Sequence, residues 1–275
     1  MLRPGAPLRA GQEPQKVHQA LQADVWAPET EILLDRIGVE PGWKCADLAC
    51  GPAGILGILA RRVGSEGLVI GADRGDELAR QAQHATLEAG QLQVQLVVTD
   101  LLDPALGESS FDLVHLRFAL HLVDPEAAVA RMTRLAKPGG FVAIQEPDLA
   151  SWRYRPATAA WPRLLAALTA AIADSGDPNV GRRAPDLLEA AGLEGVSVRC
   201  SALTLGNRHP HMRLPLAWAA AQREVIVGLG LARPSELDAW IEELEEYLED
   251  EAVTMVTPTT IQAWGRRPKP PENTW

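Results

Sequence analysis

The chain has 275 residues, of which 47% are hydrophobic and 23% charged, as in an ordinary globular protein. This composition excludes disorder, a collagen-like repeat and a coiled coil as descriptions of the whole chain. With 26 Lys and Arg against 36 Asp and Glu, the net charge is −10, which repels phosphate backbones and argues against a nucleic-acid partner. The longest apolar stretch, Leu164–Ala173, is shorter than the roughly 20 residues of a membrane span, so no membrane partner is expected.

In chain order, Met1–Pro14 is expected to be a loose arm, followed by helices over Val17–Trp26 and Pro28–Ile37. Strands are then expected over Lys44–Ala49, Leu68–Ala72, Val94–Val98, Asp112–Leu116 and Phe141–Ile144. Helices over Ile55–Val63, Glu77–Ala89 and Pro125–Leu135 separate them. This alternation is typical of βαβ units, and it predicts an α/β fold with a doubly wound, mostly parallel sheet that binds ligands at the carboxyl ends of its strands.

The second half of the chain is less regular. Helices are expected over Trp161–Ser175, Asp186–Ala191, Leu214–Gly228 and Ser235–Glu251, and strands over Val196–Leu205 and Val253–Trp264. The tail Gly265–Trp275 is rich in proline and is expected to be loose. Seven acidic residues within Glu242–Glu251 indicate a solvated helix face and not a metal site.

The three cysteines, Cys45, Cys50 and Cys200, form no Cys-x-x-Cys pair. A low and odd count of this kind is typical of a reducing compartment, so a cytoplasmic protein is predicted. Met1–Gln15 has no apolar core and is not expected to be a signal peptide. His209 and His211 have no ligand spacing that would support a metal site, so no metal is expected.

A turn of small residues, Ala49-Cys50-Gly51-Pro52-Ala53-Gly54, follows the first expected strand. One interpretation is a dinucleotide site, with Gly51 and Gly54 as two of the three glycines and Asp73 as the ribose acid. Ala49 departs from that pattern. A second interpretation explains more residues, because Asp47, Asp73 and Asp100 end three successive strands at spacings of 26 and 27 residues.

In this second interpretation, each group of the ligand meets a matching group of the chain. The Asp47 carboxylate suits an ammonium group, and the helix start at Ile55 offers N–H groups to a carboxylate. Asp73 would bind ribose hydroxyls, and Asp100 would accept a hydrogen bond from an adenine amino group. An amino acid, a ribose and an adenine in this order make S-adenosylmethionine.

The sequence resembles the class I S-adenosylmethionine-dependent methyltransferases, and most closely their small-molecule branch, which includes ubiquinone, menaquinone and bacterial natural-product methyltransferases. The stretches that carry the resemblance are Asp47–Gly54, Val69–Asp73, Thr99–Leu101, Phe111–His115 and Leu135–Gly140. The resemblance covers roughly Trp26–Asp148, and it implies a Rossmann-like, seven-stranded sheet with a helical cap. Ala49 and Ala53 stand where the family usually has glycine.

The resemblance also implies which residues contact the cofactor. These are Asp47, Ala49, Cys50, Gly51, Gly54, Asp73, Arg74, Asp100, Leu101 and Arg117. Asp47 and the turn would hold the methionine part, Asp73 the ribose, and Asp100 with Leu101 the adenine. For each acid the alternative is an ordinary cap or turn residue, and for Arg117 it is a surface salt bridge.

Candidate catalytic residues follow the fourth and fifth strands. His121 and Glu146 are the predicted general bases, with Asp148 as a further candidate. The alternatives are a helix histidine bonded to backbone and a capping acid in a turn held by Pro147. The expected activity is methyl transfer to a small, apolar or aromatic metabolite, at an oxygen, nitrogen or carbon atom. The alternatives are a non-methyl reaction such as cyclisation, and a non-catalytic ligand-binding protein.

The sequence also predicts a division into core and cap. The expected parts are an arm and cap helix (1–27), a cofactor-binding core (28–148), a cap insertion (149–179), a core continuation (180–208), a helical cap (209–252) and a final strand with tail (253–275). Trp26, Trp152 and Trp161 would line the acceptor pocket, or else pack the cap. A homodimer is a further possibility.

Overall fold

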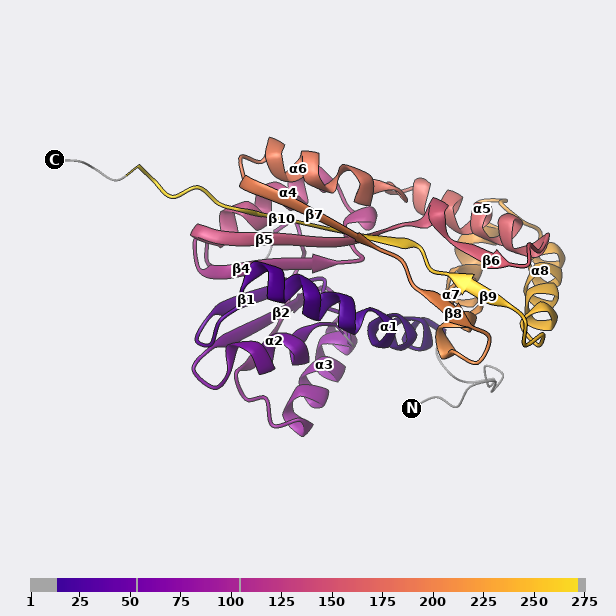
Figure 1. Ribbon diagram of the computed structural model, residues 1–275, viewed down its shortest axis with the longest axis horizontal. Helices are drawn as coiled ribbons and strands as arrows, with labels where there is room; N and C mark the ends of the chain where they lie inside the picture. The colour runs from indigo at the N-terminus through magenta and orange to yellow at the C-terminus, as the bar shows by residue number, and fades with distance from the viewer. Residues whose placement is uncertain (1–13, 53, 104, 272–275) are drawn as a thin grey trace. The chain divides into compact units, whose positions relative to one another are not determined.

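The computed structural model describes residues 14–52, 54–103 and 105–271, and it divides the chain into two compact units (Figure 1). The sheet unit comprises residues 26–146, 180–200 and 261–275. The helical unit comprises residues 1–25, 147–179 and 201–260. The expected arm over Met1–Pro14 lies outside the described residues except for Pro14, and Ala53 lies outside them as well.

A seven-stranded sheet in the order β3-β2-β1-β4-β5-β10-β7 forms the centre of the sheet unit. Its strands are β1 Lys44–Leu48, β2 Leu68–Asp73, β3 Val94–Val98, β4 Phe111–Arg117, β5 Ala136–Asp148, β7 Glu194–Ser201 and β10 Thr259–Arg266. The pairs β1–β2, β1–β4, β2–β3 and β4–β5 are parallel. The expected doubly wound, mostly parallel sheet is confirmed.

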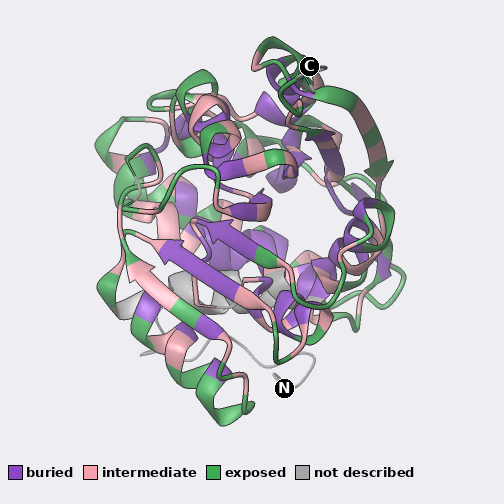
Figure 2. Ribbon diagram, turned by 90° about the vertical axis from the view of Figure 1, so that its left-hand side faces the viewer, coloured by how far each residue is buried: buried purple, intermediate pink, exposed green. Residues whose placement is uncertain are grey.

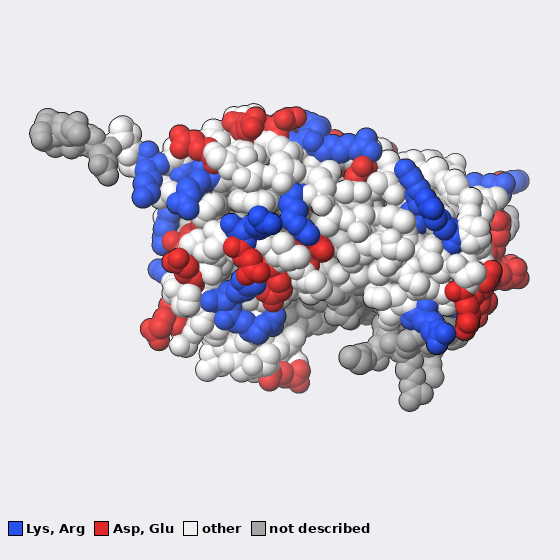
Figure 3. All heavy atoms as spheres, in the orientation of Figure 1, with Lys and Arg blue, Asp and Glu red and all other residues white. Residues whose placement is uncertain are grey.

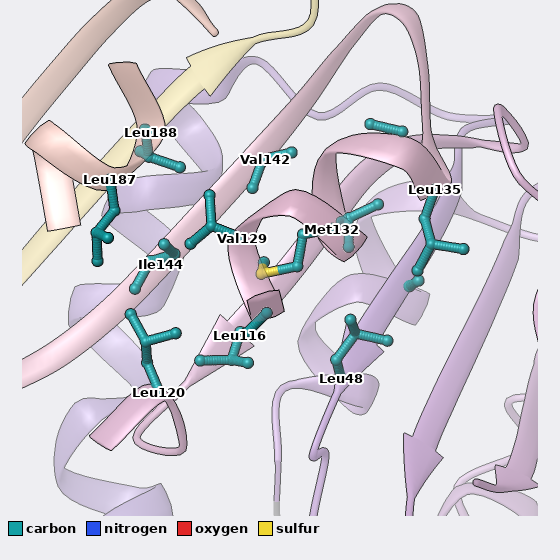
Figure 4. Packing of buried hydrophobic residues seen from close by; sticks show 14 of the residues in the cluster. Leu48, Leu116, Leu120, Val129, Met132, Leu135, Val142, Ile144, Leu187 and Leu188 are labelled. Carbon is teal, nitrogen blue, oxygen red and sulfur yellow. The ribbon is translucent and has the colours of Figure 1, made fainter. Parts of the chain in front are cut away.

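Apolar side chains on the two faces of this sheet pack against different helices. One cluster joins Cys45, Leu113 and Ala143 of the strands to Leu33 and Leu34 of α1 (Pro14–Ile37) and to α2 Leu56–Val63. The other joins Leu48, Leu116 and Ile144 to α4 Pro125–Leu135 and α6 Ala184–Ala190 (Figure 4). The central strands are therefore buried on both faces (Figure 2), which is why they read as continuous apolar runs.

The sheet unit has further helical elements, including the part of α1 that packs in the first cluster. They are α3 Asp76–Glu88, the 3₁₀ turns η1 Leu120–Leu122 and η3 Val180–Arg183, and the second half of α1 Pro14–Ile37. α4 begins at the N-cap Asp124, whose side chain accepts a hydrogen bond from Ala127 N, with Pro125 in its first turn.

The helical unit contains α5 Ala160–Ala173, α7 Leu214–Gly228, α8 Pro234–Tyr247, η2 Leu149–Ser151 and η4 Pro210–Arg213. A second, antiparallel sheet in the order β6-β9-β8 is formed by Arg153–Arg155, Thr254–Val256 and Thr204–Gly206. Trp152 is buried between Trp161 and Trp218, with ring centroids 5.0 and 6.2 Å away. Its indole N–H donates to Met255 Sδ, and that of Trp161 donates to Trp152 O. These indoles therefore pack this unit, as the second of the two interpretations holds.

The acidic stretch of α8 behaves as expected. Its carboxylates are exposed, while Leu244 and Leu248 are buried (Figure 3). No helix among the described residues is long and apolar enough to cross a membrane.

Several boundaries differ from the sequence-based predictions. One helix, α1, runs through Pro28 where two were predicted. The proline removes one backbone hydrogen bond from the helix, and the helix continues past it because the flanking turns are held by packing. The strand predicted over Val253–Trp264 is two strands, β9 and β10, which belong to different sheets and are separated at Thr257-Pro258. The strand predicted over Val196–Leu205 is likewise split into β7 and β8.

The fifth strand is longer than predicted at both ends. β5 includes Lys137–Gly140, which lay between the predicted helix Pro125–Leu135 and the predicted strand Phe141–Ile144, and the register against β4 shifts there between Phe111 and Leu113. At its other end β5 continues through Glu146 to Asp148, so these acids lie in a strand and not in a turn. The predicted loose tail is also ordered at its start, since Arg267 exchanges backbone hydrogen bonds with Gly139 and Gly140.

Candidate functional site

The turn between β1 and α2 is built from residues with unusual backbone angles. Ala49 has φ +52° and Gly51 has φ +56°, in the left-handed region that favours glycine. At Gly54 a Cβ atom would lie 2.2 Å from Cys50 O and 3.1 Å from Asp47 Oδ2. The chain therefore approaches itself too closely at Gly54 for any side chain, and the turn is a cradle of bare backbone at the carboxyl end of β1.

Asp73, the last residue of β2, holds this turn in place. Its Oδ2 accepts a hydrogen bond from Gly51 N at 2.9 Å, and its Oδ1 accepts one from Gly75 N at 2.9 Å. An ionised carboxylate has about four acceptor sites, so each oxygen keeps capacity for a further donor such as a ribose hydroxyl. Asp73 is only partly buried, as such a role requires.

Two other predicted cofactor residues have different surroundings. The exposed Asp100 follows β3, and its Oδ1 accepts from Leu102 N at 2.7 Å, which fixes its own turn. Leu101 is partly buried against the cluster of Figure 4. Arg74 is exposed. A backbone hydrogen bond connects the end of β3 to the end of β2, because Thr99 N donates to Asp73 O at 2.9 Å.

Cys50 differs from the other residues of the turn. Its thiol is buried in the core, its N–H donates to Ala72 O at 3.1 Å, and burial together with the charge of Asp47 raises the pKa of the thiol. The side chain therefore packs, and a contact of Cys50 with a cofactor stays a prediction that concerns its carbonyl group.

Asp47 belongs to a buried polar chain that sequence reasoning missed. His115 Nδ1 donates to Asp47 Oδ1 at 2.7 Å, and His115 Nε2 lies 3.0 Å from Gln145 Oε1. Thr30 Oγ1 of α1 lies 3.0 Å from the same amide oxygen. Asp47, His115 and Gln145 are almost fully buried. The register explains the meeting, because Asp47 pairs with His115, and Arg117 with Gln145, on the same face of adjacent strands.

Arg117 ends β4 on this same face. Its Nη1 donates to Thr30 Oγ1 at 3.2 Å, and its guanidinium group lies 5.5 Å from the centre of the Phe118 ring. Burial lowers the pKa of Arg117 to about 10, and the charge of Asp47 partly opposes that shift. No ion pair joins Arg117 to a carboxylate among the described residues. The alternative of a surface salt bridge is therefore not what the structure shows.

Glu146 and His121 come together on the opposite face of the sheet. Glu146 Oε1 accepts from Ala119 N and Leu120 N, both at 2.7 Å, and Oε2 accepts from His121 Nδ1 at 2.9 Å. Glu146 is fully buried, while the His121 side chain keeps 14% exposure. His121 is thus bonded to a carboxylate and not to backbone, and with Nδ1 protonated its Nε2 is left as a proton acceptor.

Phe118, between Arg117 and this turn, has φ +56°, which is rare for a large side chain. Its N–H donates to Gln145 O at 2.9 Å, and its ring meets the buried Trp26 edge-on at 5.9 Å. Backbone strain of this kind concentrates at functional sites.

Among the described residues, no group of three or more His, Cys, Asp or Glu side chains could hold a metal ion.

Residues 46–144 match the family model of the methyltransferase domain. This part of the chain is therefore similar to methyltransferase domains, in agreement with the resemblance seen in the sequence. The matched range runs from β1 into β5 and so includes the glycine turn, Asp47, Asp73, Arg117 and His121. S-adenosylmethionine is the cofactor that this similarity implies.

Relatives of the methyltransferase domain include the nocamycin O-methyltransferase of Saccharothrix syringae, 30% identical over 51% of this chain and 52% of the relative. The demethylmenaquinone methyltransferase of Bacillus cereus is 35% identical over 44% of this chain and 50% of the relative. The chain thus spans about half the length of these curated relatives. The crystal structure of the [4+2]-cyclase SpnF shares the fold with a TM-score of 0.55, at 16% identity, over 98% of this chain and 89% of that one.

The described residues include groups that suit the amino-acid end and the ribose of S-adenosylmethionine. The backbone at Gly51 has open space beside it, Asp73 has free acceptor capacity next to it, and Asp47 turns Oδ2 toward Gly54. Arg117 supplies a partly buried cation whose charge interacts with that of Asp47. Of the residues predicted from the sequence, the structure therefore brings Asp47, Asp73, the turn and Arg117 into one region of contacts, and joins His121 to Glu146.

Proposed function

We propose that this chain transfers the methyl group of S-adenosylmethionine to a small-molecule acceptor. The observation that carries the proposal is the arrangement of two carboxylates about one glycine turn. Asp73 accepts from Gly51 N at 2.9 Å, and Asp47 directs Oδ2 toward Gly54. This arrangement lies at the carboxyl ends of adjacent parallel strands, within the residues that match the methyltransferase domain.

When bound, the cofactor supplies an activated methyl group on a sulfonium centre. The residues of the chain then have mainly to bind, orient and exclude water, since the leaving group needs no further activation. Asp47 suits the ammonium group and Arg117 the carboxylate of the amino-acid end, while Asp73 suits the ribose diol. Gly51 leaves open space in the turn for this approach, and Gly54 lets the chain pass close to Cys50 O, which keeps the turn tight.

We assign proton removal from the acceptor to His121. Glu146 Oε2 fixes the ring by accepting from Nδ1 at 2.9 Å, so the lone pair of Nε2 is available to a hydroxyl, amine or acidic carbon. Glu146 itself is fully buried and already accepts three hydrogen bonds, so it orients His121 and does not act as the base. Asp148 remains a sequence-based candidate.

For the acceptor we propose an apolar or aromatic metabolite. Two relatives are named for methylation of nocamycin and demethylmenaquinone, which supports a small-molecule acceptor. The methylated atom is left open between oxygen, nitrogen and carbon. A core and cap with the boundaries given above, a cytoplasmic location and a homodimer remain predictions from the sequence.

Calorimetric titration with S-adenosylmethionine tests the first step, and binding at micromolar or tighter affinity is expected. Incubation with labelled cofactor and a panel of aromatic and quinone-like acceptors, read by mass spectrometry, tests the second. A product heavier by one methyl group supports methyl transfer. A product of unchanged mass that forms only with bound cofactor would instead support a rearrangement such as cyclisation. Absence of cofactor binding would contradict the proposal altogether.

A further inference from the structure

The buried polar chain on the α1 face of the sheet includes two residues, His115 and Gln145, that have no part in the steps described so far. It runs from Asp47 of β1 through His115 of β4 and Gln145 of β5 to Thr30 of α1. His115 and Gln145 have no exposed surface at all, so neither can contact a substrate. Burying such groups costs free energy unless they are paired, and here they are paired to one another. The chain ends at the carboxylate that the proposed function assigns to the cofactor.

The two oxygens of Asp47 are used differently. His115 Nδ1 holds Oδ1 at 2.7 Å, and a Cβ atom at Gly54 would lie 3.1 Å from Oδ2. One oxygen is therefore fixed by the imidazole ring, and the other is aimed into the glycine turn. Without the ring, the carboxylate would be free to rotate about its last bond, and Oδ2 would lose that direction.

The hydrogen-bond partners of His115 also set its charge. A carboxylate only accepts, so Nδ1 carries a proton. Gln145 turns its amide oxygen to His115 and Thr30, while its Nε2 has no partner among the described residues. If the amide is rotated by half a turn, its NH₂ group donates one hydrogen to His115 Nε2 and the other to Thr30 Oγ1. His115 Nε2 then accepts and carries no proton, so the imidazole ring, with a proton on Nδ1 alone, is neutral.

We favour the rotated arrangement, since it pairs every amide hydrogen and lets the single Thr30 hydroxyl proton bond Trp26 O. With His115 neutral, the buried polar chain adds no positive charge beside Asp47, and Arg117 is the cation whose charge acts on that carboxylate. The amino-acid end of the cofactor is a zwitterion, whose ammonium group is opposite in charge to Asp47 and whose carboxylate is opposite in charge to Arg117.

We propose that His115, held by Gln145 and Thr30, is a positioning residue that aims the Asp47 carboxylate at the ammonium group of the cofactor. The proposal rests on the proposed function and goes beyond it in one respect. It states that a residue with no access to the cofactor determines affinity for the amino-acid end alone, and leaves affinity for the nucleoside end unchanged.

The test compares two probes, S-adenosylmethionine and 5′-methylthioadenosine, which has the nucleoside and the thioether but no amino-acid group. For His115→Phe we expect affinity for S-adenosylmethionine to fall about 10- to 100-fold, the effect of losing a hydrogen bond to a charged group. Affinity for methylthioadenosine should change less than about twofold. His115→Asn, whose amide can replace Nδ1–H as donor to Oδ1, should restore most of the lost affinity.

Gln145→Met is a second, milder variant that leaves the contact between Asp47 and His115 in place, and an intermediate loss for S-adenosylmethionine alone is expected. It keeps the test informative if His115→Phe does not fold. Gln262→Met is the matched control, since Gln262 is equally buried and bonds Glu29 O and Arg199 away from Asp47. It should alter stability without altering the ratio of the two affinities.

Equal loss of both probes in the His115 and Gln145 variants, or no loss of either, would overturn the positioning role. Failure of the unaltered protein to bind either probe is a different result, because it would overturn the proposed function itself.

Discussion

Gly51 donates its backbone N–H to Asp73 Oδ2 at 2.9 Å, and this hydrogen bond joins the turn after β1 to the last residue of β2. A residue proposed to bind ribose thus also shapes the turn proposed to bind the amino-acid end. The two parts of the cofactor site are therefore linked by one side chain, and changes at Asp73 should affect both.

Asp73→Ala removes this acceptor and the one for Gly75 N. Loss of a charged acceptor costs about 1.5–3 kcal/mol, so the dissociation constant for S-adenosylmethionine should rise about 10- to 100-fold by calorimetry. Asp76→Ala is the control, since Asp76 is exposed and pairs with Arg80 on the surface of α3. An unchanged constant in Asp73→Ala would refute the ribose assignment.

Gly54→Ala should abolish cofactor binding, because the added Cβ would lie 2.2 Å from Cys50 O, which is backbone and cannot move aside alone. Gly57→Ala, three residues later, is the matched control. Its Cβ would meet Gln91 Oε1 at 3.5 Å, Gln91 Nε2 at 3.7 Å and Arg61 Nη1 at 3.9 Å, which are ordinary van der Waals contacts. Alanine within a helix is favoured over glycine by about 0.5–1 kcal/mol. Equal cofactor affinity in the two variants would show that the turn between β1 and α2 does not bind the cofactor.

Ala49→Gly should be near neutral or stabilising in urea unfolding. Alanine at φ +52° costs about 1–2 kcal/mol, which offsets the about 0.4–1 kcal/mol that glycine loses through the greater freedom of the unfolded chain. The same change at the exposed helical Ala127 should destabilise by about 1 kcal/mol. If both variants lose the same stability, the left-handed angle of Ala49 carries no strain.

His121→Gln should lower kcat about 10²- to 10⁴-fold with any acceptor that must lose a proton, while the dissociation constant for the cofactor stays unchanged. Glu146→Gln should also lower kcat, and in addition reduce the free energy of unfolding by about 1–3 kcal/mol, since two backbone N–H groups lose a charged acceptor. His84→Gln, at an exposed histidine of α3, serves as the control. Full activity of His121→Gln would exclude it as the base.

The sequence was informative wherever one strand or helix could be recognised by its own residues. The runs that became β1 to β4 and the helices α4 and α7 were predicted nearly to the residue, because buried parallel strands are short apolar runs and Asp124-Pro125 marks a helix start. The split of Val253–Trp264 into β9 and β10 was missed, since which sheet a strand joins depends on partners distant in sequence.

The site was predictable only in part, for the same reason. Asp47, Asp73 and the glycine turn follow strands in a recognisable order. His115 and Gln145 were inside predicted strands and carried no motif of their own, and only the register between β1, β4 and β5 brings them to Asp47. A usable signal was present, because His115 and Arg117 are two residues apart and so share one face of a strand.

Substitution of Arg117 is expected to change the free energy of unfolding and the affinity for the cofactor in opposite directions. Burial lowers its pKa to about 10, so the folded protein holds the charged form less readily than the unfolded chain does. Because both states are charged below about pH 10, this penalty is fully present at neutral pH and fades only as the pH rises above that value. Arg117→Met should therefore raise the free energy of unfolding at pH 7 by about 1–2 kcal/mol, less than the full shift because a hydrogen bond to Thr30 is lost.

The same change should weaken S-adenosylmethionine binding at least about tenfold, since the cofactor's carboxylate loses its cation. Arg134→Met, at a half-exposed arginine paired with Glu108, should change neither quantity by more than about 0.5 kcal/mol. A less stable Arg117→Met with unaltered cofactor affinity would mean that Arg117 holds α1 to β4 through Thr30 and takes no part in binding. A more stable variant with weaker binding would instead show that the protein keeps an unfavourable buried charge because the cofactor requires it.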